Sequence, residues 1–131
     1  MGQPAAKQGD KVVGVDIHII MIPAPPGPPV PTPLPHPFNG MLSQGLSTNV
    51  KIQGMPAATM NSIAMNAPPH IPQGGPFQKP PANQGKVQMG STTVLINNKG
   101  AARMGDPVMT CNDPTDAPTG SIIAVSTVMI G

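Results

Sequence analysis

At 131 residues the chain has the length of a single domain, and only 9% of its residues are charged, with a net charge of +2. Without Trp or Tyr and without a stripe of Lys and Arg, a nucleic-acid-binding surface is not indicated. No run of 18 apolar residues is present, which excludes a membrane-spanning helix, and a single cysteine excludes an internal disulfide framework.

Short strands are predicted along the chain at 12–22, 50–52, 87–89, 94–96 and, near the carboxy terminus, 121–130. These segments are rich in β-branched residues and are bounded by Gly, Pro or Asn. No segment has a sustained 3.6-residue apolar period, so few helices are expected. The stretch INNKG at 96–100 predicts a hairpin turn, because Asn and Gly tolerate positive φ. The pattern predicts an all-β fold.

A proline-rich segment follows the first predicted strand. Nine of the fifteen residues from Pro23 to Pro37 are proline, and we expect residues 23–40 to form a loop. The segment also contains His36. A proline-rich linker is held extended by the sterics of its rings and has no evident use for an imidazole, so this histidine needs an explanation.

The sequence contains three imperfect copies of one unit. With a shift of 44 residues, 50–65 aligns with 94–109 at six identical positions, which include an Ala-Ala pair, and 4–12 aligns with 100–108. The three units read PAAK, PAAT and GAAR, and they lie near 4–18, 50–70 and 94–111. Three such units arranged about an axis would give a pseudo-threefold domain.

Each unit is followed by one potential metal ligand. His18 lies eight residues after Asp10, His70 lies eight residues after Ser62, and Cys111 lies five residues after Asp106. His36 is the only other His or Cys. Because Zn²⁺ prefers four tetrahedral N or S ligands, we predict one structural zinc bound by His18, His36, His70 and Cys111.

Simpler roles exist for each of these side chains when it is taken alone. A histidine in an apolar strand is more often a core or surface residue, a histidine in a proline-rich loop is more often solvated, and a lone cysteine is most often an inert buried thiol. The metal-site hypothesis therefore rests on all four side chains being used together.

The units, and above all VLINNKGAARMGD before Cys111, resemble the PAAR-repeat (proline-alanine-alanine-arginine) proteins, the spike tips of bacterial contractile injection machines. The resemblance implies one domain over 1–131, shaped as a small cone of short strands with a zinc near its apex, bound by three His and one Cys. It also implies assembly in the bacterial cytoplasm without a signal peptide, and delivery outside the cell as part of an injection apparatus.

The function implied by the resemblance is structural. One copy would cap a trimeric β-helical spike through its wide end, where we expect Val50, Ile52, Val94 and Ile96 to dock together with Ile122 to Ile130. It would also touch a target membrane, with effector proteins as further partners. Two other readings are an adaptor whose PPGPPVPTPLP binds an aromatic groove and an enzyme with Cys111 as nucleophile. No acidic orienting group or oxyanion loop is recognisable for the enzyme.

Overall fold

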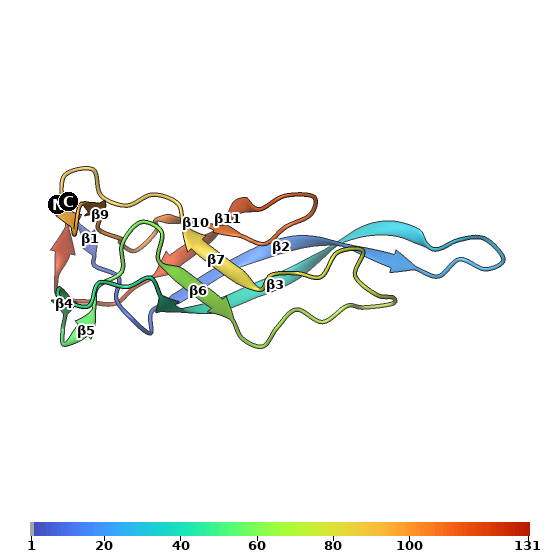
Figure 1. Ribbon diagram of the computed structural model, residues 1–131, viewed down its shortest axis with the longest axis horizontal. Helices are drawn as coiled ribbons and strands as arrows, with labels where there is room; N and C mark the ends of the chain where they lie inside the picture. The colour runs from blue at the N-terminus through green and yellow to red at the C-terminus, as the bar shows by residue number, and fades with distance from the viewer. Residues whose placement is uncertain (1) are drawn as a thin grey trace.

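The computed structural model describes residues 2–131, which form strands, turns and loops with no helix (Figure 1). Within this described part no helix could cross a membrane. The strands are β1 (Gln3–Pro4), β2 (Lys11–Ile22), β3 (Val30–Gln44), β4 (Lys51–Ile52), β5 (Met55–Pro56), β6 (Ile63–Asn66), β7 (Gln84–Val87), β8 (Leu95–Ile96), β9 (Lys99–Gly100), β10 (Pro107–Thr110), β11 (Ala117–Ile123) and β12 (Met129–Ile130). The all-β prediction is confirmed.

Six strands close into an antiparallel barrel in the order β10-β11-β2-β3-β6-β7. Side chains alternate between the barrel interior and its surface, as the twofold strand period requires. Few large apolar side chains point into the barrel, so the core is small and is built around Phe38. Its other large members are Val12, Leu42, Val87, Val108 and Ile122.

The proline-rich segment is a strand and not a loop, so the expectation for 23–40 is wrong beyond the turn at 23–29. β3 pairs with β2 along its length, from Val30 opposite Ile22 to Met41 opposite Lys11. The two strands form a long hairpin that extends beyond the barrel to the narrow end of the molecule (Figure 1).

The spacing of the prolines explains how this segment can be a strand. In an antiparallel pair, alternate residues direct both backbone polar groups toward the same neighbour. Pro31, Pro33, Pro35 and Pro37 occupy every second position of β3, so their missing N–H groups would all point away from β2, toward an edge. Proline is tolerated in a sheet at such edge positions. The residues between the prolines remain free to pair with β2.

Three two-stranded hairpins form the wide end of the molecule. β4 pairs with β5, β8 pairs with β9, and β1 pairs with β12, so the third hairpin is assembled from the two ends of the described chain (Figure 1). The predicted turn is present in the second hairpin, where Asn97 and Asn98 have φ of 53° and 68°. A small core beneath the hairpins contains one Ala and one Ile from each. Its members are Ala5, Ala57, Ala101, Ile52, Ile96 and Ile130.

The three Ala-Ala pairs that align in the sequence lie around one closed ring of hydrogen bonds. The N–H of Ala6 donates to the oxygen of Ala102 (2.9 Å), that of Ala102 to Ala58 (3.0 Å), and that of Ala58 to Ala6 (3.0 Å). All three alanines are buried. A larger side chain would have no room here, because three backbones approach one another around a common centre.

Each unit then turns with the same local geometry. The carboxylates of Asp10 and Asp106 accept the N–H of the residue three positions earlier, at 2.9 and 2.8 Å, and the hydroxyl of Ser62 does the same at 2.9 Å. The residue before each of these has positive φ, and it is Gly, Gly and Asn, the types that tolerate this region. Ser62 therefore replaces Asp in the turn of the second unit.

The carboxy-terminal segment differs from the single strand predicted at 121–130. β11 ends at Ile123 in the barrel, and β12 pairs with β1 at the wide end. Periodicity alone does not reveal the break, because both pieces are apolar and short.

Candidate metal centre

Four different segments place the predicted ligands in one region. His18 comes from β2 and His36 from β3, both at inward-facing positions, while His70 lies in the connection from β6 to β7 and Cys111 follows β10 directly. The ring centroids of the three histidines lie 4.9 to 5.5 Å apart, and the Cys111 Sγ lies 3.7 Å from Nε2 of His18. All four side chains are buried.

The tightest group of potential ligands includes an acid that the sequence analysis missed. Ligand atoms of Asp16, His18, His70 and Cys111 all lie within 4.8 Å of one another, and His36 lies beside this group rather than in it. The sequence contained a pattern that could have identified Asp16 as part of the site. It precedes His18 by two residues in a predicted strand, so both side chains had to share one face.

The carboxylate of Asp16 is fully buried and is held by five side chains. Its Oδ2 accepts a hydrogen bond from Nε2 of His70 (2.7 Å) and a weak one from the Cys111 thiol (3.4 Å). The hydroxyl of Thr110 donates to Oδ1 (2.5 Å), and Asn112 and Thr119 lie at 3.5 and 3.4 Å. A buried carboxylate requires such partners, because its desolvation is otherwise very costly.

The hydrogen bonds of the rings determine which nitrogen can face a metal. Nδ1 of His36 lies 3.0 Å from the carbonyl of Leu34, so Nδ1 carries the proton and Nε2 keeps its lone pair. In His70, Nδ1 accepts from the Asn66 amide (3.3 Å) and Nε2–H donates to Asp16. His70 would therefore have to break its bond to Asp16 in order to bind a metal through Nε2.

Burial also changes the acidity of two groups. Burial, together with the nearby charge of Asp16, raises the pKa of the Cys111 thiol to about 11. Burial lowers the pKa of His18, and the carboxylate of Asp113 opposes that shift. In the absence of a metal, the thiol is therefore protonated at neutral pH and His18 is neutral.

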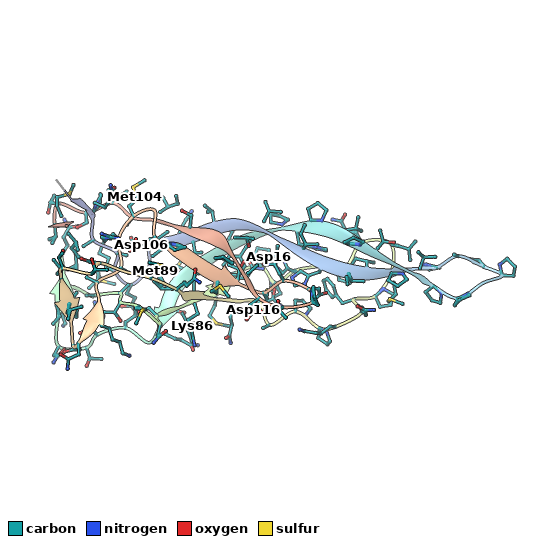
Figure 2. The ribbon with its side chains drawn as sticks, turned by 90° about the horizontal axis from the view of Figure 1, so that it is seen from above. Asp16, Lys86, Met89, Met104, Asp106 and Asp116 are labelled. Atoms are coloured by element: carbon teal, nitrogen blue, oxygen red, sulfur yellow. The ribbon has the colours of Figure 1, made fainter. Side chains whose placement is uncertain are left out.

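These residues suit a transition metal ion. Imidazole nitrogens and a thiolate are the ligands that Zn²⁺ prefers, and Nδ1 of His18 is the one buried side-chain N or O atom in residues 2–131 that lacks a hydrogen-bond partner. A bound ion would crosslink β2, the end of β10 and the connection from β6 to β7, replacing part of a core that is small. The site lies near the middle of the long axis, where Asp16 is labelled in Figure 2, and not near the apex as predicted.

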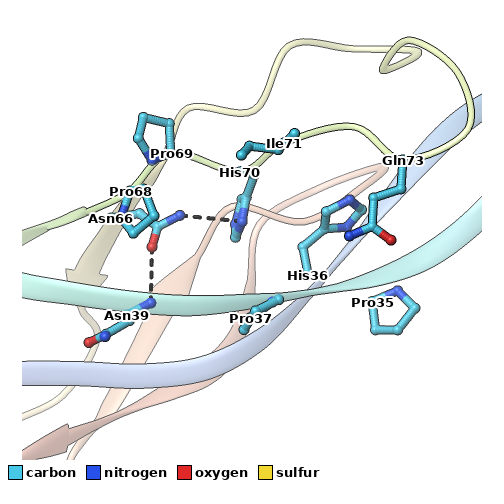
Figure 3. A pocket seen from close by; sticks show the side chains of 10 residues that line it. All are labelled: Pro35, His36, Pro37, Asn39, Asn66, Pro68, Pro69, His70, Ile71 and Gln73. Atoms are coloured by element: carbon cyan, nitrogen blue, oxygen red, sulfur yellow. Dashed lines mark hydrogen bonds between the residues drawn. The ribbon is translucent and has the colours of Figure 1, made fainter.

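A pocket of about 380 Å³ opens beside the site, between β3 and the connection that carries His70 (Figure 3). His36 and His70 both line it, with Asn39, Asn66 and Gln73 among the polar groups. Asn66 bridges its walls, because its Oδ1 accepts the N–H of Asn39 while its amide donates to His70. The pocket therefore borders the predicted site on the side of His36 and His70.

Comparison with known proteins gave one family. Residues 77–131, which contain the third unit and Cys111, match a family model described as PAAR motif. No curated protein matches the chain.

Proposed function

The chain is a PAAR-repeat protein by the motif in its residues 77–131, and we propose that one copy caps a trimeric β-helical spike and forms the point of a contractile injection machine. PAAR proteins are spike-tip proteins that associate with the spike complex of such machines, as part of a secreted apparatus.

The ring of Ala6, Ala58 and Ala102 carries this proposal. Its three hydrogen bonds run in one rotational direction, and the three hairpins of the wide end surround it. A second set repeats the pattern, since the N–H groups of Ala5, Ala57 and Ala101 donate to the carbonyls of Val128, Val50 and Val94 at 2.8, 3.0 and 3.0 Å. One chain with such pseudo-threefold symmetry can match a true trimer end to end.

The wide end offers exposed apolar side chains for docking that differ in part from the predicted ones, and Lys51 of β4 is exposed beside them. Ile52 and Ile96 are 6% and 7% exposed and belong to the small core, so they are unavailable for docking. Ile122 and Ile130 are also buried, in the barrel core and in the small core. Their neighbours are exposed instead. Leu95 is 59% and Met129 57% exposed, at corresponding positions of two hairpins. Exposed apolar strands are a liability unless a partner covers them.

The opposite end is suited to contact with a target membrane. No Asp, Glu, Lys or Arg occurs between Asp16 and Lys51, a stretch that contains all of the long hairpin beyond Asp16. The outer face of the hairpin presents Val15 and Ile17, which are 52% and 38% exposed, beside the proline rings. Residues 17–44 of the hairpin would therefore bring no formal charge of their own into an apolar layer.

The metal centre would stiffen the molecule between these two ends. We assign His18, His36, His70 and Cys111 as the ligands of one structural Zn²⁺, with Asp16 as the rival of His36 for the fourth position. Four protein ligands leave no position for a reactive water, so such a site is structural. The raised pKa of Cys111 also argues against a free thiolate nucleophile.

The adaptor reading receives less support. A polyproline ligand is a free, extended segment, whereas Val30 to Met41 pairs with β2 as a strand. Effector proteins remain further partners in the proposal, as the role of the family implies.

Native mass spectrometry of the chain mixed with a trimeric spike fragment tests the proposal. We expect one chain per three spike chains, and we expect Leu95→Glu with Met129→Glu to abolish the complex while metal content is unchanged. Ile71→Glu, at a residue that is 67% exposed in the connection carrying His70, is the matched control and should leave binding intact. A complex with three copies of the chain, or loss of binding only with the control, would refute the proposed orientation.

A further inference from the structure

We propose that Asp113 is a positioning residue for the metal centre, which accepts a hydrogen bond from Nδ1 of His18 and thereby directs Nε2 of that ring toward the metal. The inference rests on the metal site of the proposed function. It concerns a residue outside the four predicted ligands and outside the group that includes Asp16.

The first observation is the unsatisfied nitrogen of His18. Its side chain is 1% exposed, yet Nδ1 has no hydrogen-bond partner. A buried polar atom without a partner is unfavourable, so such an atom needs a reason to be retained. Metal binding provides one, because a ligating histidine usually donates its other N–H to a carboxylate or carbonyl.

The second observation is the group that faces this nitrogen. Oδ2 of Asp113 lies 3.6 Å from Nδ1, just beyond hydrogen-bonding distance, and its side chain is 3% exposed. On the far side of the ring, Nε2 lies 3.7 Å from Sγ of Cys111. His18 therefore stands between a carboxylate and the proposed site, in the order that a carboxylate, histidine and metal triad requires.

The third observation is that Asp113 is fixed in place. Its Oδ2 accepts the N–H of Ile19 (2.9 Å), and its own N–H donates to the carbonyl of Ile17 (2.8 Å). These bonds attach the segment after Cys111 to β2 on either side of His18. A small rotation of the ring toward Asp113 is then enough to form the missing hydrogen bond.

The charge of the carboxylate matters as well as its position. A carboxylate can only accept, so it selects the tautomer of His18 with the proton on Nδ1 and the lone pair on Nε2. An amide at position 113 that keeps its oxygen on the N–H of Ile19 also keeps that oxygen toward Nδ1, because Oδ2 of Asp113 serves both groups, but a neutral amide oxygen is a weaker acceptor than a carboxylate. The variant therefore loses the negative charge that strengthens the hydrogen bond from Nδ1 and raises the basicity of Nε2, so the metal is bound more weakly.

Asp113→Asn is therefore the test, with Asp116→Asn as the matched control on an exposed acid of the same connection. Zinc affinity is measured by competition with a chelator. We expect Asp113→Asn to lose about 10-fold to 100-fold in affinity and Asp116→Asn to remain at the wild-type value. The visible spectrum of cobalt-loaded protein should change with Asp113→Asn alone. Asp113→Glu, which keeps the charge, should recover part of the affinity.

A second measurement needs no variant. Nitrogen NMR of the imidazoles in zinc-loaded wild-type protein should show the proton of His18 on Nδ1. A proton on Nε2, or an affinity of Asp113→Asn equal to that of the control, would overturn the inference even if zinc binds. Wild-type protein that binds no zinc would overturn the metal site itself, together with any role of Asp113 in it.

Discussion

Metal uptake by the metal-free protein should release about one proton, and that proton should come from Cys111. Ligation requires a thiolate, and burial together with Asp16 raises the pKa of the Cys111 thiol to about 11. At a pH of about 8 the metal must supply roughly 4 kcal/mol to remove this proton, at about 1.4 kcal/mol for each unit of pKa. His18 contributes no proton, because burial lowers its pKa and its ring is already neutral at this pH.

The pH dependence separates this buried thiol from an ordinary one. A thiol with a pKa of about 8.5 is nearly all thiolate at a pH of about 9.5 and would release only about 0.1 proton there. With a pKa of about 11, Cys111 is still protonated at that pH and should release close to one. Apparent zinc affinity should therefore keep rising about tenfold per pH unit up to about pH 11. Each rise of one pH unit lowers about tenfold the concentration of protons that compete with zinc for the sulfur.

The assay is a titration of metal-free protein with a weak zinc chelate in lightly buffered solution, with proton release followed by a pH indicator. Cys111→Ser is the control, and it should abolish the release, because serine has no acidic proton in this range. A release near 0.1 proton at a pH of about 9.5 would refute the raised pKa. A release that persists in Cys111→Ser would refute Cys111 as its source.

Three further predictions follow from the fold. Because burial lowers the pKa of His18, the unfolded chain binds more protons than the folded chain, and the free energy of unfolding should fall as pH drops below about 6.5. Equal urea midpoints on both sides of that pH would contradict this. Ser62→Asp restores the turn residue of the other units but should lower the free energy of unfolding by about 1 to 3 kcal/mol. The reason is that Ser62 is fully buried and its hydroxyl donates to the carbonyl of Gly45 (2.9 Å). A variant with wild-type stability in chemical denaturation would show that the turn outweighs this contact. Replacing Pro33 and Pro35 by threonine should add two N–H groups to the free edge of β3 and increase self-association in sedimentation experiments, whereas a monomeric variant would show that the prolines do not protect that edge.

Local chemistry explains which features of the fold could be predicted. The β-branched residues from Val12 to Ile22 predicted β2, and the Asn97-Asn98 turn predicted the β8–β9 hairpin, because both signals depend on residues adjacent in sequence. The proline-rich segment was predicted wrongly as a loop. Proline content alone does not show that the prolines fall on alternate residues whose N–H groups face an edge, since that depends on the strand that pairs with them.

By itself, the sequence determined the inventory: three related units, an all-β chain, and three histidines with one cysteine available for one site. It did so because repeats, strand period and ligand type are properties of residues and their spacing. Only the tertiary structure decided the register of the units around the Ala6, Ala58 and Ala102 ring and the closure of one hairpin from both ends of the chain. It also decided that Asp16 and Asp113 lie against the histidines. Those contacts join segments tens of residues apart, and pairing between distant segments depends on the whole barrel rather than on any local pattern.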